Sequence, residues 1–183
     1  MSFEMKKDKI SSCEVASKAK GEQSIETEIS LPDYCSEIKR ILKCTVTPGI
    51  HSVSRTGDRV GAVGTIMIRV IYQGEKDRID CYEKSLELNV ACQMKDITDS
   101  MILKGKAMTS YFNCRAVNQR KISDGGSVSV EFTAFEVKVR ELPCEIDYGC
   151  IQVRKEKVTS ENVICVGEKI FDLSETAILP KEK

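Results

Sequence analysis

The sequence predicts an all-β, antiparallel, sandwich-like domain of two similar β blocks, with one short helix near residues 33–43. Apolar and polar residues alternate in several segments, as they do in strands with one buried face. Turn residues separate these segments at intervals of roughly 8–12 residues, which is typical of sandwiches and barrels. Strands do not alternate with long helical segments, as a parallel sheet would require.

Composition predicts three regions along the 183 residues. Residues 1–24 are polar and rich in lysine, so we expect a flexible N-terminal arm. Residues 25–145 contain the β domain, and residues 146–183 have the pattern of a C-terminal β extension. A chain of this length can bury a core without covalent cross-links.

The first block begins with alternation from Ile25 to Leu31, which Pro32 interrupts. The helix is expected next, because a proline suits a first turn and acidic residues precede basic ones there. Residues 56–59 predict a hairpin turn between Ile50–Arg55 and a long strand, Val60–Tyr72. That strand is apolar on both faces, so we expect both to be covered. Residues 73–77 should turn the chain into strands at 78–82 and 86–90.

The second block repeats this plan. A strand is expected over Lys104–Val117, a tight connection over 118–121, a hairpin turn over 124–126 and a strand over Ser127–Arg140. Apolar residues occupy even positions through Ala134 and odd positions from Phe135, which predicts a β-bulge there. Pro143 is expected to end the block.

Charge and hydropathy exclude several classes of partner. Twenty-eight basic and 28 acidic residues cancel, so no net field favours nucleic acid or an anionic membrane. No apolar run has the length of a membrane span or of a signal-peptide core. We therefore expect synthesis in the cytoplasm, no membrane insertion and no nucleic-acid partner.

No residue pattern predicts catalysis, a cofactor or a metal, so we do not expect an enzyme. The single histidine, His51, lies in an alternating segment and is expected to face solvent. The closest cysteine spacings, Cys144-x5-Cys150 and Cys35-x8-Cys44, are wider than those of zinc knuckles. Three glycines at 57, 61 and 64 run into a strand, which favours turn and close packing over phosphate binding.

Nine cysteines are unusual for a chain made in reducing cytoplasm. They can be small buried hydrophobes, metal ligands or thiols that cross-link later, and the sequence favours a mixture of the first and third. Candidates for intermolecular disulfides are those expected at edges or in loops: Cys13, Cys35, Cys144 and Cys150. Burial is the default for those in or beside strand-like runs: Cys44, Cys81, Cys92, Cys114 and Cys165.

Residues 31–43, LPDYCSEIKRILK, form a recognisable motif. The segment resembles the opening of the SPOCS-type domain of sporulation proteins from clostridia and related spore formers. Further similarities follow at residues 58–60, 70–72 and 118–122, and the resemblance covers roughly residues 25–145. Candidate interaction residues within the motif are Leu31, Pro32, Asp33, Tyr34 and Ile38.

The resemblance implies a role in building the spore. Better-known family members look like factors that tether the coat to the forespore surface, often through a LysM module, and no such pattern follows Pro143 here. The expectation is a structural, self-assembling component of the spore envelope, in coat, exosporium or appendage. It would be made in the mother-cell cytoplasm, deposited on the spore surface and cross-linked by disulfides.

The resemblance also leaves a second function open. An adaptor would instead recruit other coat proteins to the forespore. The principal partner under the first hypothesis is a further copy of this chain. The two ends would either add strands to a neighbouring copy or pack on their own domain, and the sequence favours neither.

Overall fold

The computed structural model describes residues 4–147 and the isolated positions 154, 156, 157 and 159. The predicted extension at 146–183 therefore lies almost entirely outside the described residues. The chain divides into two compact units. The larger is Cys13–Val137, and the smaller combines Met1–Ser12 with Lys138–Lys183.

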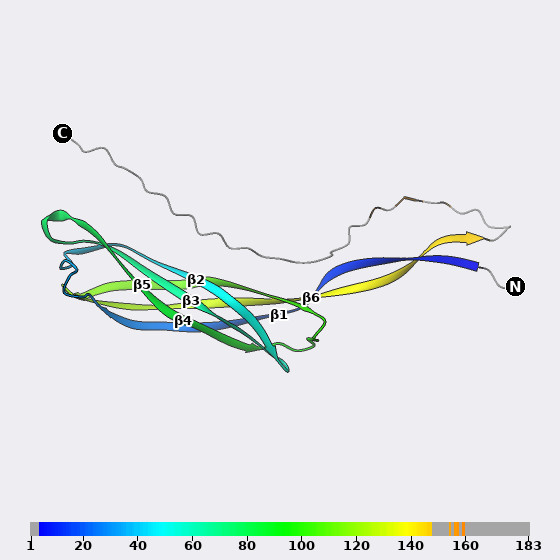
Figure 1. The fold of residues 1–183 in the computed structure, drawn as a ribbon, viewed down its shortest axis with the longest axis horizontal. Coiled ribbons are helices and arrows are strands. Elements are labelled where there is room, and N and C mark those ends of the chain that lie inside the picture. Colours follow the sequence, from blue (N-terminus) through cyan, green and yellow to red (C-terminus); the bar gives the residue numbers. More distant parts are fainter. Residues whose placement is uncertain (1–3, 148–153, 155, 158, 160–183) are drawn as a thin grey trace, which may run out of the picture. The chain divides into compact units, whose positions relative to one another are not determined.

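Two three-stranded sheets make up the described structure, which confirms the all-β, sandwich-like prediction. One has the order β2-β3-β4, formed by β2 (Arg40–Thr56), β3 (Arg59–Gln73) and β4 (Ile79–Gln93). The other has the order β1-β6-β5, formed by β1 (Glu4–Ser30), β6 (Lys121–Asp147) and β5 (Ile102–Asn118). The strands of both sheets extend along a similar direction in the larger unit (Figure 1).

The two predicted blocks correspond to the two sheets. The first block is the antiparallel sheet β2-β3-β4, with its strands paired along their lengths. The second is the β5–β6 hairpin, to which β1 adds as a third strand although it precedes the first block in sequence. Local patterning predicted both hairpins, whereas the partner of β1 depends on tertiary packing.

The hydrophobic core of the larger unit lies between the sheets. Alternate residues of β3 from Val60 to Tyr72 are almost completely buried. Even-numbered residues of β6 from Ile122 to Ala134 are buried too, and Ile25 and Ile29 of β1 join the same cluster. The prediction that both faces of β3 are covered is wrong, because Val63 on its other face is 51% exposed.

The helix expected near 33–43 is absent. Residues 33–35 form a turn and bend, and β2 begins at Arg40. Among the described residues, helical structure is limited to a 3₁₀ turn at Glu75–Asp77 in the β3–β4 connection. The flexible arm is also wrong for residues 4–24, because they belong to β1.

Three predictions for the second block fail. Residues 124–126 lie inside β6, and the hairpin reverses at residues 119–120 instead. The β5–β6 register is regular where a bulge was expected, at Ala134 and Phe135. Strand β6 continues past Pro143 to Asp147.

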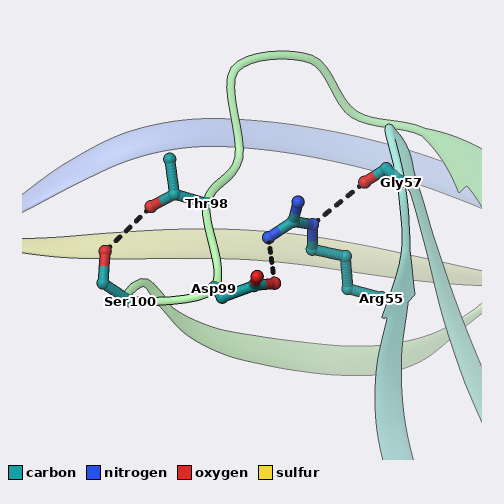
Figure 2. Close-up of polar contacts among 5 residues, drawn as sticks. All are labelled: Arg55, Gly57, Thr98, Asp99 and Ser100. Carbon is teal, nitrogen blue, oxygen red and sulfur yellow. Dashed lines mark hydrogen bonds and ion pairs between the residues drawn. The ribbon is translucent and has the colours of Figure 1, made fainter.

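The connection between β4 and β5 closes one end of the sandwich. Met94 and Ile97 of this connection are buried, and the Met94 amide donates to the carbonyl of Asp58 at 2.8 Å. Figure 2 shows Arg55 of β2 donating to the carbonyl oxygen of Gly57 and to Asp99, at 2.9 and 2.7 Å. Arg55 thus ties the β2–β3 turn to the connection that leads to the second sheet.

Side-chain hydrogen bonds join the outer strands of the two sheets. Gln23 of β1 donates to the carbonyl of Glu87 and accepts from the amide of Asn89, both on β4, at 2.9 and 2.8 Å. On the opposite side, Thr109 of β5 donates to the carbonyl of Val46 of β2 at 3.1 Å. These bonds occupy backbone groups at sheet edges that could otherwise pair with another strand.

Candidate functional site

The segment of the LPDYC motif is a connection docked on the tip of the β5–β6 hairpin. The amides of Leu31 and Ile38 donate to the carbonyls of Arg120 and Gln119, at 2.8 and 2.7 Å. Arg120 also donates to the carbonyl of Pro32 at 3.3 Å. The motif therefore carries the chain from the sheet of β1 to the sheet of β2.

Only some of the candidate interaction residues in the docked motif are exposed to solvent. Leu31 and Ile38 are buried in the core, and Pro32 is half-buried. Asp33 is exposed, and Tyr34 is 86% exposed. Binding through this segment remains a prediction, and Tyr34 is its most accessible apolar side chain.

A partly buried polar cluster supports the other side of the motif. Ser36 donates a hydrogen bond to the carboxylate of Asp80 on β4. Tyr72 on β3 is buried beside Cys35 and Ser36, and this burial raises the pKa of its phenol, while a hydrogen bond with Ser36 opposes the rise. A Cβ at Gly74 would lie 2.9 Å from the Cβ of Ser36, so the cluster leaves no room for a side chain there.

The candidate cross-linking thiols differ in accessibility. Cys144 is exposed, whereas Cys13 and Cys35 are half-buried; Cys150 lies outside the described residues. The ion pairs of Lys6 with Glu145 and of Lys7 with Glu141, at 3.9 and 3.5 Å, belong to the smaller unit that contains Cys144. Cross-linking between copies through these thiols remains a prediction.

Sequence analysis missed the exposed thiol of Cys81. It lies on β4, whose odd-numbered residues face solvent and whose even-numbered residues face the core. A signal was present, because Cys81 shares its parity with Glu83, Ser85 and Glu87. Cys92 has the opposite parity and is half-buried, and burial raises the pKa of its thiol against the opposing effect of Arg59.

Sequence analysis also missed a disulfide between Cys44 and Cys114, both expected to be buried free thiols. The bond links β2 to β5, and hence one sheet to the other, with a Cα–Cα distance of 6.4 Å. The two cysteines are 70 residues apart in sequence. No local pattern could have paired them, because their proximity depends on how the sheets stack.

Asp124 is a third feature that the sequence did not reveal. Its side chain is buried on β6 with 3% exposure, and neither carboxylate oxygen has a hydrogen-bond partner among the described residues. Burial raises the pKa of Asp124 to about 6, and the ammonium of Lys84 opposes this shift. A buried carboxyl group without partners is uncommon in folded proteins.

The remaining polar features include the single histidine and one surface hollow. His51 is exposed, as predicted, and its Nε2 lies 2.5 Å from the hydroxyl of Thr65. A hollow of about 460 Å³ contains Glu28 and Arg115, but Glu28 already pairs with Lys121 at 2.5 Å. Within the described part of the chain, no three His, Cys, Asp or Glu side chains are placed to hold a metal ion.

Comparison with known families gives one match. Residues 37–117, from the middle of the docked motif through most of β5, match the family model described as SipL, SPOCS domain. The chain carries a SPOCS-type domain. The resemblance inferred from the motif is thereby confirmed, although the match begins at Glu37 and leaves Leu31–Ser36 outside it.

The SPOCS-type domain indicates a sporulation-related role. The searches of curated proteins and of solved structures found no significant match. Over the described residues, no helix has the length and hydrophobicity to cross a membrane.

Proposed function

We propose that this SPOCS-type protein is a structural, non-enzymatic, self-assembling component of the bacterial spore envelope, deposited on the spore surface. Its principal partner is another copy of the chain. The observation that carries the proposal is the presence of accessible thiols on the β strands of this chain. Cys81 and Cys144 are exposed, and they lie in different units of the chain.

Accessible thiols suit cross-linking after assembly. A thiol reacts as its thiolate, and access to solvent favours both ionisation and attack on a partner disulfide. In the reducing mother-cell cytoplasm such thiols stay reduced, whereas release of the spore exposes them to oxidants. Disulfides between copies would then make an assembly covalent without an enzyme.

The test is assembly of the purified full chain under reducing and oxidising conditions. Ordered sheets, tubes or fibres in negative-stain images support the proposal, and so does a ladder of oligomers on non-reducing gels that reductant collapses. A chain that remains monomeric at high concentration under both conditions contradicts it.

Single serine variants identify the cross-linking thiols. Cys144→Ser and Cys81→Ser should each weaken the ladder, as should Cys13→Ser, Cys35→Ser or Cys150→Ser if those positions contribute. Cys92→Ser is the matched control, because its half-buried thiol has a raised pKa and should contribute little. An unchanged ladder in a variant lacking Cys13, Cys35, Cys81, Cys144 and Cys150 would refute disulfide cross-linking by accessible thiols.

The exposed Tyr34 favours a second candidate function, an adaptor that recruits another coat protein. A tyrosine with most of its ring in solvent is a common anchor in protein interfaces. An adaptor would be a monodisperse monomer or dimer that binds one purified coat protein with defined stoichiometry. Tyr34→Ala should then weaken that binding, while Tyr111→Ala, at another exposed tyrosine, should leave it unchanged.

A further inference from the structure

The inter-sheet disulfide has a buried carboxyl group beside it. Cys114 of β5 and Asp124 of β6 are directly opposite each other in the β5–β6 register. Both side chains face the interior, since Cys114 is bonded to Cys44 of the other sheet and Asp124 is buried. Opposed residues on one face of an antiparallel pair have Cβ atoms about 4.5–5.5 Å apart, so the carboxyl group lies next to the disulfide.

The surroundings of Asp124 leave its carboxyl group available for proton transfer. Its oxygens accept no hydrogen bond among residues 4–147. Lys84 of β4 faces it, and the Lys84 ammonium also donates to the Thr27 hydroxyl and the Glu28 carbonyl of β1 at 2.9 and 3.1 Å. The charged residues Glu26 and Glu28 of β1 and Arg115 of β5 line the same hollow as Asp124. The side chain of Thr27 is uncharged, and Cys44 of β2 pairs with the apolar Val70 of β3.

We propose that Cys44, Cys114 and Asp124 form a thiol–disulfide exchange site, in which Asp124 moves the proton. The co-reactant is a small disulfide, RSSR, when the site is oxidised and the corresponding thiol, RSH, when it is reduced. Both cysteines are half-buried rather than sealed in the core. A carboxyl group with a pKa near 6 is ionised at neutral pH and can accept a thiol proton.

Oxidation proceeds in two exchanges. Asp124 takes the proton of Cys114 as its sulfur attacks one sulfur of RSSR; the S–S bond of RSSR breaks, and Asp124 protonates the departing RS⁻ to RSH. Cys44 then attacks the Cys114 sulfur of this mixed disulfide, its proton passes through Asp124 to the second RS⁻, and the Cys44–Cys114 bond closes. Two electrons leave the cysteines, and one RSSR becomes two RSH.

Reduction runs through the same steps in reverse. The protonated carboxyl group of Asp124 then donates to the departing sulfur of Cys114. The site therefore switches the covalent link between β2 and β5 according to the redox state outside the protein. It operates within one chain, so it does not depend on assembly of several copies.

The test follows oxidation of the fully reduced full-length protein by oxidised glutathione across pH 4.5–8. Free thiols are alkylated at each time point, and mass spectrometry quantifies the peptide pair that contains Cys44 and Cys114. The wild-type rate should show an inflection near pH 6, in addition to the rise due to thiol ionisation. Asp124→Asn should lose this inflection and react about a hundred-fold more slowly at pH 7.

Two variants separate proton transfer from a structural effect. Glu22→Gln is the matched control, because Glu22 accepts from Ser127 of β6 at 2.6 Å, and Ser127 pairs with Tyr111 of β5 rather than with a cysteine. It should keep the wild-type rate and inflection. Lys84→Met removes the cation that lowers the pKa of Asp124, so the inflection should move to higher pH.

Three results would overturn the proposal. The first is an Asp124→Asn protein that oxidises at the wild-type rate or retains the inflection. The second is peptide mapping that joins Cys44 or Cys114 to other cysteines. The third is an inflection that Lys84→Met does not move, which decides the question even when Asp124→Asn does not fold.

Discussion

Loss of the Cys44–Cys114 bond should strongly destabilise the larger unit. The double variant Cys44→Ala/Cys114→Ala removes the covalent link between the outer strands of the two sheets. A cross-link restricts the unfolded chain more strongly when it closes a longer loop, and this one joins residues 70 apart. For a loop of this length the chain-entropy relation gives a loss of about 4 kcal/mol in the free energy of unfolding.

That loss is a large fraction of the stability of an ordinary domain, which is about 5–15 kcal/mol. It should lower the melting temperature by roughly 10 °C, using about 3 °C per kcal/mol for a chain of this size. Thermal and urea unfolding monitored by circular dichroism would measure both quantities. The oxidised wild type must first be shown to contain the bond by peptide mapping.

Two controls separate the cross-link from packing. Reduced wild-type protein should unfold close to the double variant, because it lacks the same bond but keeps both sulfur atoms. Cys92→Ala removes a half-buried thiol that forms no disulfide, and it should cost far less than the double variant. If oxidised and reduced wild type unfold at the same urea concentration, the bond does not stabilise the fold and the reasoning fails.

Three further predictions follow from single positions. Asp124→Asn should stabilise the protein at pH 7.5 by up to about 3 kcal/mol. The raised pKa of Asp124 makes the folded state bind a proton more tightly than the unfolded state between pH 4 and 6, so wild-type stability falls as pH rises through that window. Urea titrations at pH 4 and 7.5 check this, and an equal gain in stability at both pH values would contradict it. Gly64→Ala should destabilise the fold by several kcal/mol, because the added Cβ would overlap the backbone carbonyl oxygen of Gly49 on β2. Gly125→Ala in β6 should be neutral or slightly stabilising, because no atom lies within 4 Å of the added Cβ. Equal melting temperatures for the two variants would refute the packing argument. Arg55→Ala should speed hydrogen exchange of the amides in residues 94–101, because the variant loses the contacts with Gly57 and Asp99. Unchanged exchange there would show that the buried Met94 and Ile97 alone hold the connection.

Local periodicity was enough to locate the first sheet. Alternation from Val60 to Tyr72 and the turn residues at 56–59 and 73–77 correctly placed β3 and both of its hairpins. These features are visible in sequence because a buried strand face repeats every second residue and its neighbours follow directly in the chain. The solvent-facing position of His51 followed from the same pattern.

Local sequence patterns gave wrong predictions where the same residue type suits two different structures. The proline and the charges after Leu31 suit the ends of a helix, but here Arg120 and Glu37 form a 3.4 Å ion pair between the motif and the β5–β6 turn. Glycine at 126 suggested a chain reversal. Its actual role is close approach within the sheet, because a Cβ there would lie 2.6 Å from the carbonyl oxygen of Tyr111.

The inter-sheet site depended entirely on tertiary structure. The sequence pattern placed Cys114 on a strand but Asp124 in a hairpin turn. Only the β5–β6 register made them neighbours, and only the stacking of the two sheets brought Cys44 to Cys114. Amino-acid order encodes which face of a strand is apolar, because that face repeats over a few residues. It does not display the contacts between distant strands, because those arise from packing the whole core at once.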